Sequence, residues 1–144
     1  MKMMAIDFGD ARTGVAMCDP LEMLASPFRV VKQKDITKLV EEIALIAKEQ
    51  NVERIVVGHP KNMNGSNGER AAKTERLVNK LKLATKLDVV LWDERSTTVL
   101  AHKILKDNEV FGKKRKNIVD AVAAVLILEN YIKFKKSRER EVIE

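Results

Sequence analysis

Two aspartates stand in stretches that are otherwise apolar. Asp7 interrupts the run Met4–Phe8, and Asp120 is the only charged residue in the run Ile118–Leu128. A third acid, Glu94, follows closely after another apolar segment. A carboxylate among buried apolar side chains is costly unless a cation, a ligand or a cluster of donors compensates its charge. These positions are therefore candidates for a site, and the rest of the chain has to decide whether they form one.

Oxygen ligands without histidine or cysteine suit a hard cation, Mg²⁺ or Mn²⁺. Two such ions, roughly 3.5–4 Å apart, can activate a water and stabilise the leaving oxygen of a phosphodiester. Basic residues around an acidic metal centre then fit a nucleic-acid substrate, because the carboxylates alone would repel it. If Asp7, Glu94 and Asp120 meet at one point, they predict metal-dependent phosphodiester cleavage.

Each acid also has an ordinary explanation. An edge strand with Asp7 facing water fits the first stretch equally well. Asp93 or Glu94 can favour the N-terminus of a following helix, and the helix dipole can explain Asp120 in a first helical turn. Two lone carboxylates in one small chain nevertheless favour a shared cation over two coincidences.

The first half of the chain predicts a hairpin, an edge strand and a helix. The runs on either side of the polar turn between Gly9 and Gly14 predict a β-hairpin. Residues 26–31 predict a third strand, placed at an edge by Pro27. Apolar spacing over 36–47 predicts a helix packed on the sheet. Candidate caps are Asp35 or Thr37 at its start, and Asn51 can end it.

The second half alternates helices with strands. Residues 54–58 and 88–92 are compact apolar strands in parallel crossover units. A helix runs between them from a capping box of Ser66 and Glu69, and another follows the second strand and includes residues 99–105. Asn117 caps a last helix that is apolar almost all round and hence deeply buried. This order predicts an α/β fold with a mixed sheet, and Asp7 on its central strand.

Two polar segments lie between these elements. The Gly-rich loop His59–Gly68 leaves a strand at its carboxyl end, where α/β sheets usually build sites. Residues 107–117 are expected to form a mobile loop, which carries Lys113, Lys114, Arg115 and Lys116 in succession. A basic run is often only a solvated surface, but beside an acidic site it can steer phosphates.

Composition limits the class of protein. The chain has 144 residues, a net charge of +6 and a pI near 9.5. This charge fits nucleic acid or an ordinary Lys-rich protein equally well. Cys18 is the single cysteine, which excludes an internal disulfide and fits a reducing cytoplasm. We expect a cytoplasmic protein without signal peptide or membrane span, with one domain over 1–136 and a charged tail over 137–144.

Four motifs together carry a family resemblance that spans almost the whole chain. They are Ile6-Asp7-Phe8-Gly9 with Arg12-Thr13-Gly14-Val15-Ala16, Val57-Gly58-His59-Pro60 with Asn62-Met63-Asn64-Gly65-Ser66, Asp93-Glu94-Arg95-Ser96-Thr97-Thr98, and Asp120-Ala121 with Ala123-Ala124. With them the chain resembles the YqgF/RuvX family, a branch of the RNase H-like nucleases related to RuvC-type Holliday junction resolvases. The resemblance implies an RNase H-like mixed five-stranded sheet, with antiparallel hairpin strands, parallel strands and helices on both faces.

The resemblance also implies a site. Asp7, Glu94 and Asp120 would be the catalytic, metal-binding acids, with Mg²⁺ or Mn²⁺ as cofactor. The residues implied to line or shape the site are Arg12, Asn62, Arg95 and Thr98. Phosphate contacts are expected from Lys61, Arg95, Lys113, Lys114, Arg115 and Lys116. RuvC-like resolvases carry an additional acid in the last helix, where this chain has Ala123 or Ala124, which predicts a leaner metal site.

The resemblance implies a nuclease that processes the 5′ end of precursor 16S ribosomal RNA. The alternatives are a Holliday junction resolvase acting on branched DNA and a non-catalytic RNA-binding factor of ribosome maturation. Asp7-x-Gly9 before a hairpin also resembles the first phosphate loop of actin-like ATPases, which need two such lobes. The expected partners are precursor ribosomal RNA or branched DNA and the precursor of the small ribosomal subunit, for a monomer or a homodimer.

Overall fold

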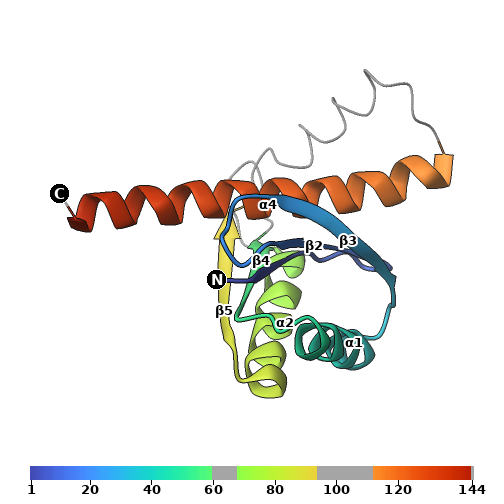
Figure 1. Ribbon diagram of the computed structural model, residues 1–144. Helices are drawn as coiled ribbons and strands as arrows, with labels where there is room; N and C mark the ends of the chain where they lie inside the picture. The colour runs from blue at the N-terminus through green and yellow to red at the C-terminus, as the bar shows by residue number, and fades with distance from the viewer. Residues whose placement is uncertain (60–67, 94–111, 144) are drawn as a thin grey trace.

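The computed structural model describes residues 1–59, 68–93 and 112–143 (Figure 1). Side chains at 59, 93, 112–121 and 140–143 lie outside that description. The sheet has five strands in the order β3-β2-β1-β4-β5. Their bounds are Met3–Asp7 (β1), Arg12–Cys18 (β2), Ala25–Lys32 (β3), Arg54–His59 (β4) and Asp88–Asp93 (β5). β2 runs antiparallel to β1 and β3, whereas β1, β4 and β5 are parallel, so the predicted mixed sheet is confirmed.

β1 is the central strand, as predicted, because it pairs with β2 on one side and β4 on the other. Its residues from Met3 to Ile6 are buried, and they alternate between two separate cores. Met4 and Ile6 belong to one core, and Met3 and Ala5 belong to the other. The explanation of Asp7 by an edge strand is therefore wrong.

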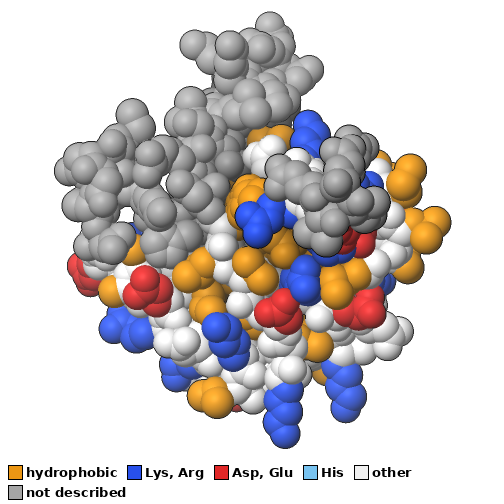
Figure 2. Space-filling model, turned by 90° about the vertical axis from the view of Figure 1, so that its left-hand side faces the viewer, with side chains coloured by type: hydrophobic (Ala, Val, Ile, Leu, Met, Phe, Trp, Pro, Cys, Tyr) orange, Lys and Arg blue, Asp and Glu red, His pale blue; other side chains and the backbone are white. Residues whose placement is uncertain are grey.

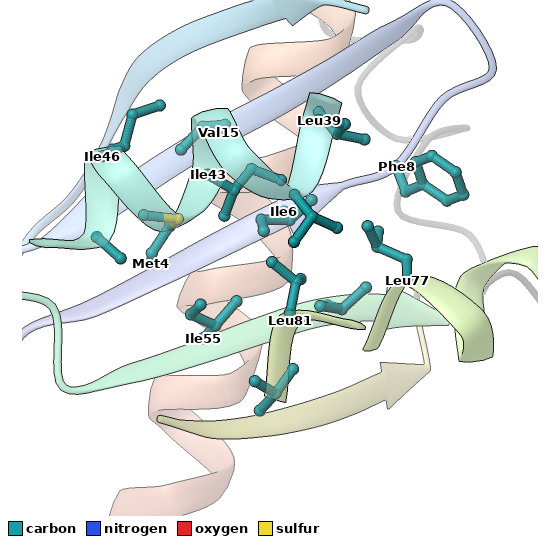
Figure 3. Packing of buried hydrophobic residues seen from close by; sticks show 14 of the residues in the cluster. Met4, Ile6, Phe8, Val15, Leu39, Ile43, Ile46, Ile55, Leu77 and Leu81 are labelled. Carbon is teal, nitrogen blue, oxygen red and sulfur yellow. The ribbon is translucent and has the colours of Figure 1, made fainter. Parts of the chain in front are cut away.

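Helices α1 (Ile36–Glu49) and α2 (Glu69–Thr85) cover one face of the sheet. Figure 3 shows side chains of both helices pointing towards the strands, among them Leu39, Ile43, Ile46, Leu77 and Leu81. Burial of these apolar side chains stabilises the fold by roughly 1.5–3 kcal/mol each. The predicted packing of the first helix on the sheet is confirmed.

The helix ends decide between alternatives in the sequence. Asp35 caps α1, because its carboxylate accepts a hydrogen bond from the Lys38 backbone N–H at 3.1 Å. The expected capping box of α2 is wrong, because α2 begins at Glu69 and Gly68 is its N-cap residue, without a side-chain cap. A capping box would need Glu69 in the third helical position rather than the first.

Helix α4 (Gly112–Ile143) covers the opposite face and projects past the sheet (Figure 1). Its 32 residues correspond to about 48 Å. The prediction of a loop is wrong for residues 112–117, which are helical, and Asn117 is not a cap. Lysine and arginine are good helix formers, so a basic run by itself is no loop signal. The prediction of burial all round is also wrong, because Val122, Val125 and Leu126 are half-buried while Ala124 is buried.

Two polar clusters fix α4 at the end of the sheet where β1 begins. Arg54 donates hydrogen bonds to Asp88 at 2.8 Å and to the Tyr131 hydroxyl of α4 at 2.9 Å. Glu22, in the turn after β2, accepts from Lys135 of α4 at 3.0 Å. Because Arg54 pairs with Met3 in the sheet, α4 passes the start of β1 near Tyr131.

The two sheet edges carry β3 and β5. β3 is an edge strand, as Pro27 predicted, and the register with β2 shifts between Val15 and Ala16. The predicted helix that includes residues 99–105 lies outside the described residues, as does the loop 60–67.

Candidate active site

The candidate site centres on Asp7, the last residue of β1, which pairs with Gly14 of β2. Its side chain is half-buried. Met3 and Ala5 pack in the core beneath α4, and Asp7 follows them in the same two-residue alternation. A carboxylate thus stands at the carboxyl end of the central strand, on the face that α4 covers. In α/β sheets ligands bind outside this end of the strands.

The turn that follows is tight. A Cβ at Gly9 would collide with the backbone carbonyl oxygen of Arg12, so a residue with a side chain fits there only if the backbone shifts. The Ala11 carbonyl accepts a hydrogen bond from the backbone N–H of Gln33 at 3.1 Å. The turn leads into half-buried Arg12, the first residue of β2. Glycine at position 9 therefore allows the backbone to turn tightly between Asp7 and Arg12.

Sequence reasoning missed two residues of α2 that contact this turn, Arg70 and Lys73. Arg70 donates to the Asp10 carboxylate at 2.7 Å and to the Phe8 carbonyl oxygen, and its guanidinium carbon lies 4.9 Å from the centre of the Phe8 ring. The Lys73 ammonium lies 3.8 Å from the same carboxylate. Neither cation was among the predicted site residues. The available signal was their spacing of three residues, which places both side chains on the same side of a helix, where they can contact one partner.

The remaining predicted site residues are only partly placed. Asp120, Lys113, Lys114, Arg115 and Lys116 belong to α4, where their backbone alone is described. The residues outside the described part are Lys61, Asn62, Glu94, Arg95 and Thr98. β5 ends at Asp93, the residue before Glu94. For all of these positions the functional assignment stays a prediction.

Metal binding is likewise not tested by the described side chains. Within residues 1–58, 68–92 and 122–139, no three His, Cys, Asp or Glu side chains are grouped so that they could hold an ion. Of the three predicted ligands, only Asp7 has a described side chain. Its carboxylate chemistry and half-buried position fit a hard cation.

No helix in the described part of the chain is long and apolar enough to cross a membrane. Helix α4 is long enough to span a membrane, but its second half carries many charged residues.

Relatives of known name are similar over most of the chain. A relative from Ruminiclostridium cellulolyticum, named as a candidate pre-16S rRNA nuclease, is 40% identical over 133 residues, which cover 92% of this chain and 94% of the relative. A relative of the same name from Desulforamulus reducens is 41% identical over 132 residues, which cover 92% and 96%.

Solved structures agree with this fold. RuvC from Thermus thermophilus matches with a TM-score of 0.58 at 14% identity, over 95% of this chain and 97% of that one. The Holliday junction resolvase of fowlpox virus matches with a TM-score of 0.53 at 12% identity, over 92% and 99%. At these identities the likeness concerns the fold alone, and it confirms the predicted RNase H-like arrangement.

A family profile completes the comparison. The profile of RuvX, described as Holliday junction resolvase, matches residues 1–134. It includes the motifs around Asp7, Glu94 and Asp120 on which the sequence prediction rested. With a profile over nearly the whole chain and relatives at about 40% identity, this chain belongs to the RuvX family.

Proposed function

We propose that this chain is a metal-dependent nuclease that hydrolyses a phosphodiester bond in precursor 16S ribosomal RNA. The observation that carries the proposal is Asp7, a half-buried carboxylate at the carboxyl end of the central strand, on the face under α4. Family membership and the names of the relatives support the reaction and the substrate.

The course of α4 supports Asp120 as a second ligand. Tyr131 lies near the start of β1, and Ala124 shares a core with Ala5. Asp120 precedes Ala124 by one helical turn, about 6 Å. Asp7 follows Ala5 by two residues, about 6.6 Å in a strand. Since α4 runs antiparallel to β1, the step back from Ala124 to Asp120 and the step forward from Ala5 to Asp7 lead towards the same end of the sheet over similar lengths.

Glu94 is proposed as the third ligand from strand alternation. Val90 and Trp92 of β5 pack against the core under α4, and Glu94 is the next member of that two-residue series. Asp7, Glu94 and Asp120 would then hold Mg²⁺ or Mn²⁺. When bound, such ions supply an activated water and stabilise the leaving oxygen of the phosphodiester.

The basic residues would bind the substrate. Lys116 precedes Asp120 by one turn of α4, so the run Lys113–Lys116 occupies the helix immediately before that acid. Figure 2 shows lysine, arginine and acidic side chains interspersed on the face that it presents, rather than one basic surface. Because this run directly precedes Asp120, we assign phosphate binding to it and to Arg12, and Lys61 and Arg95 would add further phosphate contacts. Asn62 and Thr98 would shape the same site.

A four-way DNA junction is the second candidate substrate. The description of the family profile as a Holliday junction resolvase favours it. Symmetric cleavage of a junction needs two sites, and hence a dimer. A homodimer that cuts opposed strands equally would support this alternative.

The test compares cleavage of a precursor 16S RNA fragment with cleavage of a four-way DNA junction, in Mg²⁺ or Mn²⁺. Asp7→Asn removes one negative charge with little change of shape, and should slow RNA cleavage at least about 100-fold while RNA binding persists. Glu49→Gln, an exposed change on α1, is the matched control and should leave the rate unchanged.

Each outcome has a distinct meaning. RNA cleavage that a chelator and Asp7→Asn both abolish supports the proposal. Cleavage of the junction alone replaces it with the resolvase. Tight RNA binding without cleavage, and with function kept in Asp7→Asn cells, overturns the nuclease in favour of a non-catalytic maturation factor.

A further inference from the structure

We propose that Arg70 is a positioning residue for the active site: it holds the turn after β1 and thereby fixes the orientation of Asp7. This inference rests on the proposed function, because it assigns Asp7 to catalysis. The relevant turn, residues 8–11, connects Asp7 to Arg12 and contains Gly9.

Arg70 contacts the turn in three different ways. One terminal nitrogen donates to the Asp10 carboxylate at 2.7 Å, and the other donates to the Phe8 carbonyl oxygen. The guanidinium plane also covers the Phe8 ring, which is 8% exposed and part of the core under α1 and α2. A planar fork with two donors makes such a set of contacts, which a lysine ammonium does not reproduce.

The turn needs this restraint because of Gly9. A side chain at that position would collide with the Arg12 carbonyl, so glycine is required. Glycine also has the greatest backbone freedom of any residue. The Phe8 carbonyl belongs to the peptide bond that enters Gly9, and Arg70 holds this oxygen. The constraint that glycine cannot supply thus comes from α2.

The helix that carries Arg70 is packed on the sheet. Arg70 lies in the first turn of α2, and Leu77 and Leu81 of the same helix are fully buried against the sheet. Asp10, in contrast, is 74% exposed, and its carboxylate pairs with Arg70 and with Lys73 of α2. Misplacement of a catalytic group by about 1 Å can cost 100-fold in rate. A restraint on Phe8, the residue next to Asp7, therefore bears on catalysis.

The test uses the full chain with three substitutions. Arg70→Gln removes the charge and the fork, Arg70→Lys keeps only the charge, and Arg76→Gln changes an exposed arginine of the same helix as a control. For Arg70→Gln we expect kcat for RNA cleavage to fall at least about tenfold with KM nearly unchanged. Arg70→Lys should resemble Arg70→Gln, and Arg76→Gln the unchanged chain.

Two readouts do not depend on cleavage. Hydrogen exchange at the Gln33 amide, which donates to the Ala11 carbonyl of this turn, should accelerate at least about tenfold in Arg70→Gln, while the amides of buried β4 keep their protection. Mn²⁺ affinity, measured by electron paramagnetic resonance, should weaken in Arg70→Gln, with Asp7→Asn as the reference for loss of the site.

The results separate this inference from the proposed function. If the unchanged chain cuts RNA and Arg70→Gln leaves kcat unaltered, the positioning role is wrong. If the unchanged chain cuts neither RNA nor junction, the proposed function fails. Hydrogen exchange and Mn²⁺ affinity then decide whether Arg70 holds the turn. Unaltered exchange and unaltered Mn²⁺ affinity in Arg70→Gln would then overturn its role. Loss of protection in β4 as well would indicate general destabilisation instead and would equally contradict it.

Discussion

At the residue scale, a tight turn directly follows a carboxylate whose partial burial costs free energy. Asp7 is half-buried at the end of a strand whose preceding residues are buried on both faces. Gly9 lets the backbone approach the Arg12 carbonyl, and Arg70 holds the turn from α2. Asp7 and Gly9 are neighbours in sequence, whereas Arg70 comes from a distant helix, and all three meet at this turn. The geometry of Asp7 therefore depends on residues that have no catalytic chemistry of their own.

Gly9→Ala tests this dependence directly. The added methyl group meets the Arg12 carbonyl oxygen, so the turn must shift. We expect the free energy of unfolding to fall by about 1–3 kcal/mol, together with loss of RNA cleavage. Gly68→Ala is the control, because the Gly68 φ of −87° suits any residue. Urea unfolding measures both variants; equal stability of Gly9→Ala and the unchanged chain would contradict the tight turn.

At the element scale, α4 is attached to the rest of the fold by polar contacts near the start of β1. Glu22, with a φ of 57°, accepts from Lys135 and from the N-terminal ammonium group. Asp19 organises the same turn, because its carboxylate accepts from the backbone N–H groups of Met23 and Leu24. These contacts fix where α4 crosses the sheet, and thereby where its earlier residues approach Asp7.

The pH dependence of stability follows from Glu22. Burial raises the pKa of its carboxyl, but the hydrogen bonds from Lys135 and the N-terminus outweigh this effect, so the pKa lies below the ordinary value of 4.5. A lowered pKa in the folded state gives stability that is present above the ordinary value and is lost as the pH falls through the folded-state pKa. Glu22→Gln should therefore cost about 1 kcal/mol at pH 7 and flatten the loss of stability in acid.

Urea unfolding between pH 2.5 and 7 is the measurement, with the pH range set by the titration of carboxyl groups, about 2 to 5. Glu139→Gln is the control, since Glu139 also contacts Lys135 but is 58% exposed. An acid profile of Glu22→Gln that matches the unchanged chain would show that this ion pair contributes nothing to stability.

At the scale of the whole molecule, the sheet brings distant parts of the chain to one end. β1 contributes Asp7, β5 ends just before Glu94, and α4 returns across the opposite face from α1 and α2 (Figure 1). The first turns of α4 carry four basic residues in succession. Under the proposed function, this arrangement separates the apolar support on one face from substrate binding on the other.

Salt dependence distinguishes the two faces. We expect RNA affinity to fall with salt, with a slope of about −0.7 for each phosphate contact on a single strand. Changing Lys113, Lys114, Arg115 and Lys116 to Gln should reduce the magnitude of the slope by up to about 3. Changing Lys38, Lys48, Lys80 and Lys82 to Gln on the α1 and α2 side removes the same charge and should have a smaller effect. Filter binding at several salt concentrations measures both, and equal slopes would contradict a substrate face.

The sequence by itself determined the strands, their order in the chain and the family. Two-sided burial requires nearly continuous apolar residues, so β1 and β4 were visible locally, and Asp7 stood out because it breaks such a run. The edge position of β3 followed from Pro27, whereas the sequence offered Asp35 or Thr37 as the cap of α1 and the structure selected Asp35. The start of α4 could not be predicted from the sequence, because basic residues are equally compatible with a solvated loop and an exposed helix.

Only the tertiary structure decided which polar residues meet. Arg70 and Asp10 are 60 positions apart, and Lys135 and Glu22 are 113 apart. Helical periodicity identifies the polar side of α2, but not which of its cations faces another segment, because that depends on how α2 packs on the sheet. Tertiary packing likewise turned one side of α4 towards the sheet and left Val125 half-buried. Local patterns record burial, whereas contacts between polar groups arise only when the elements are assembled.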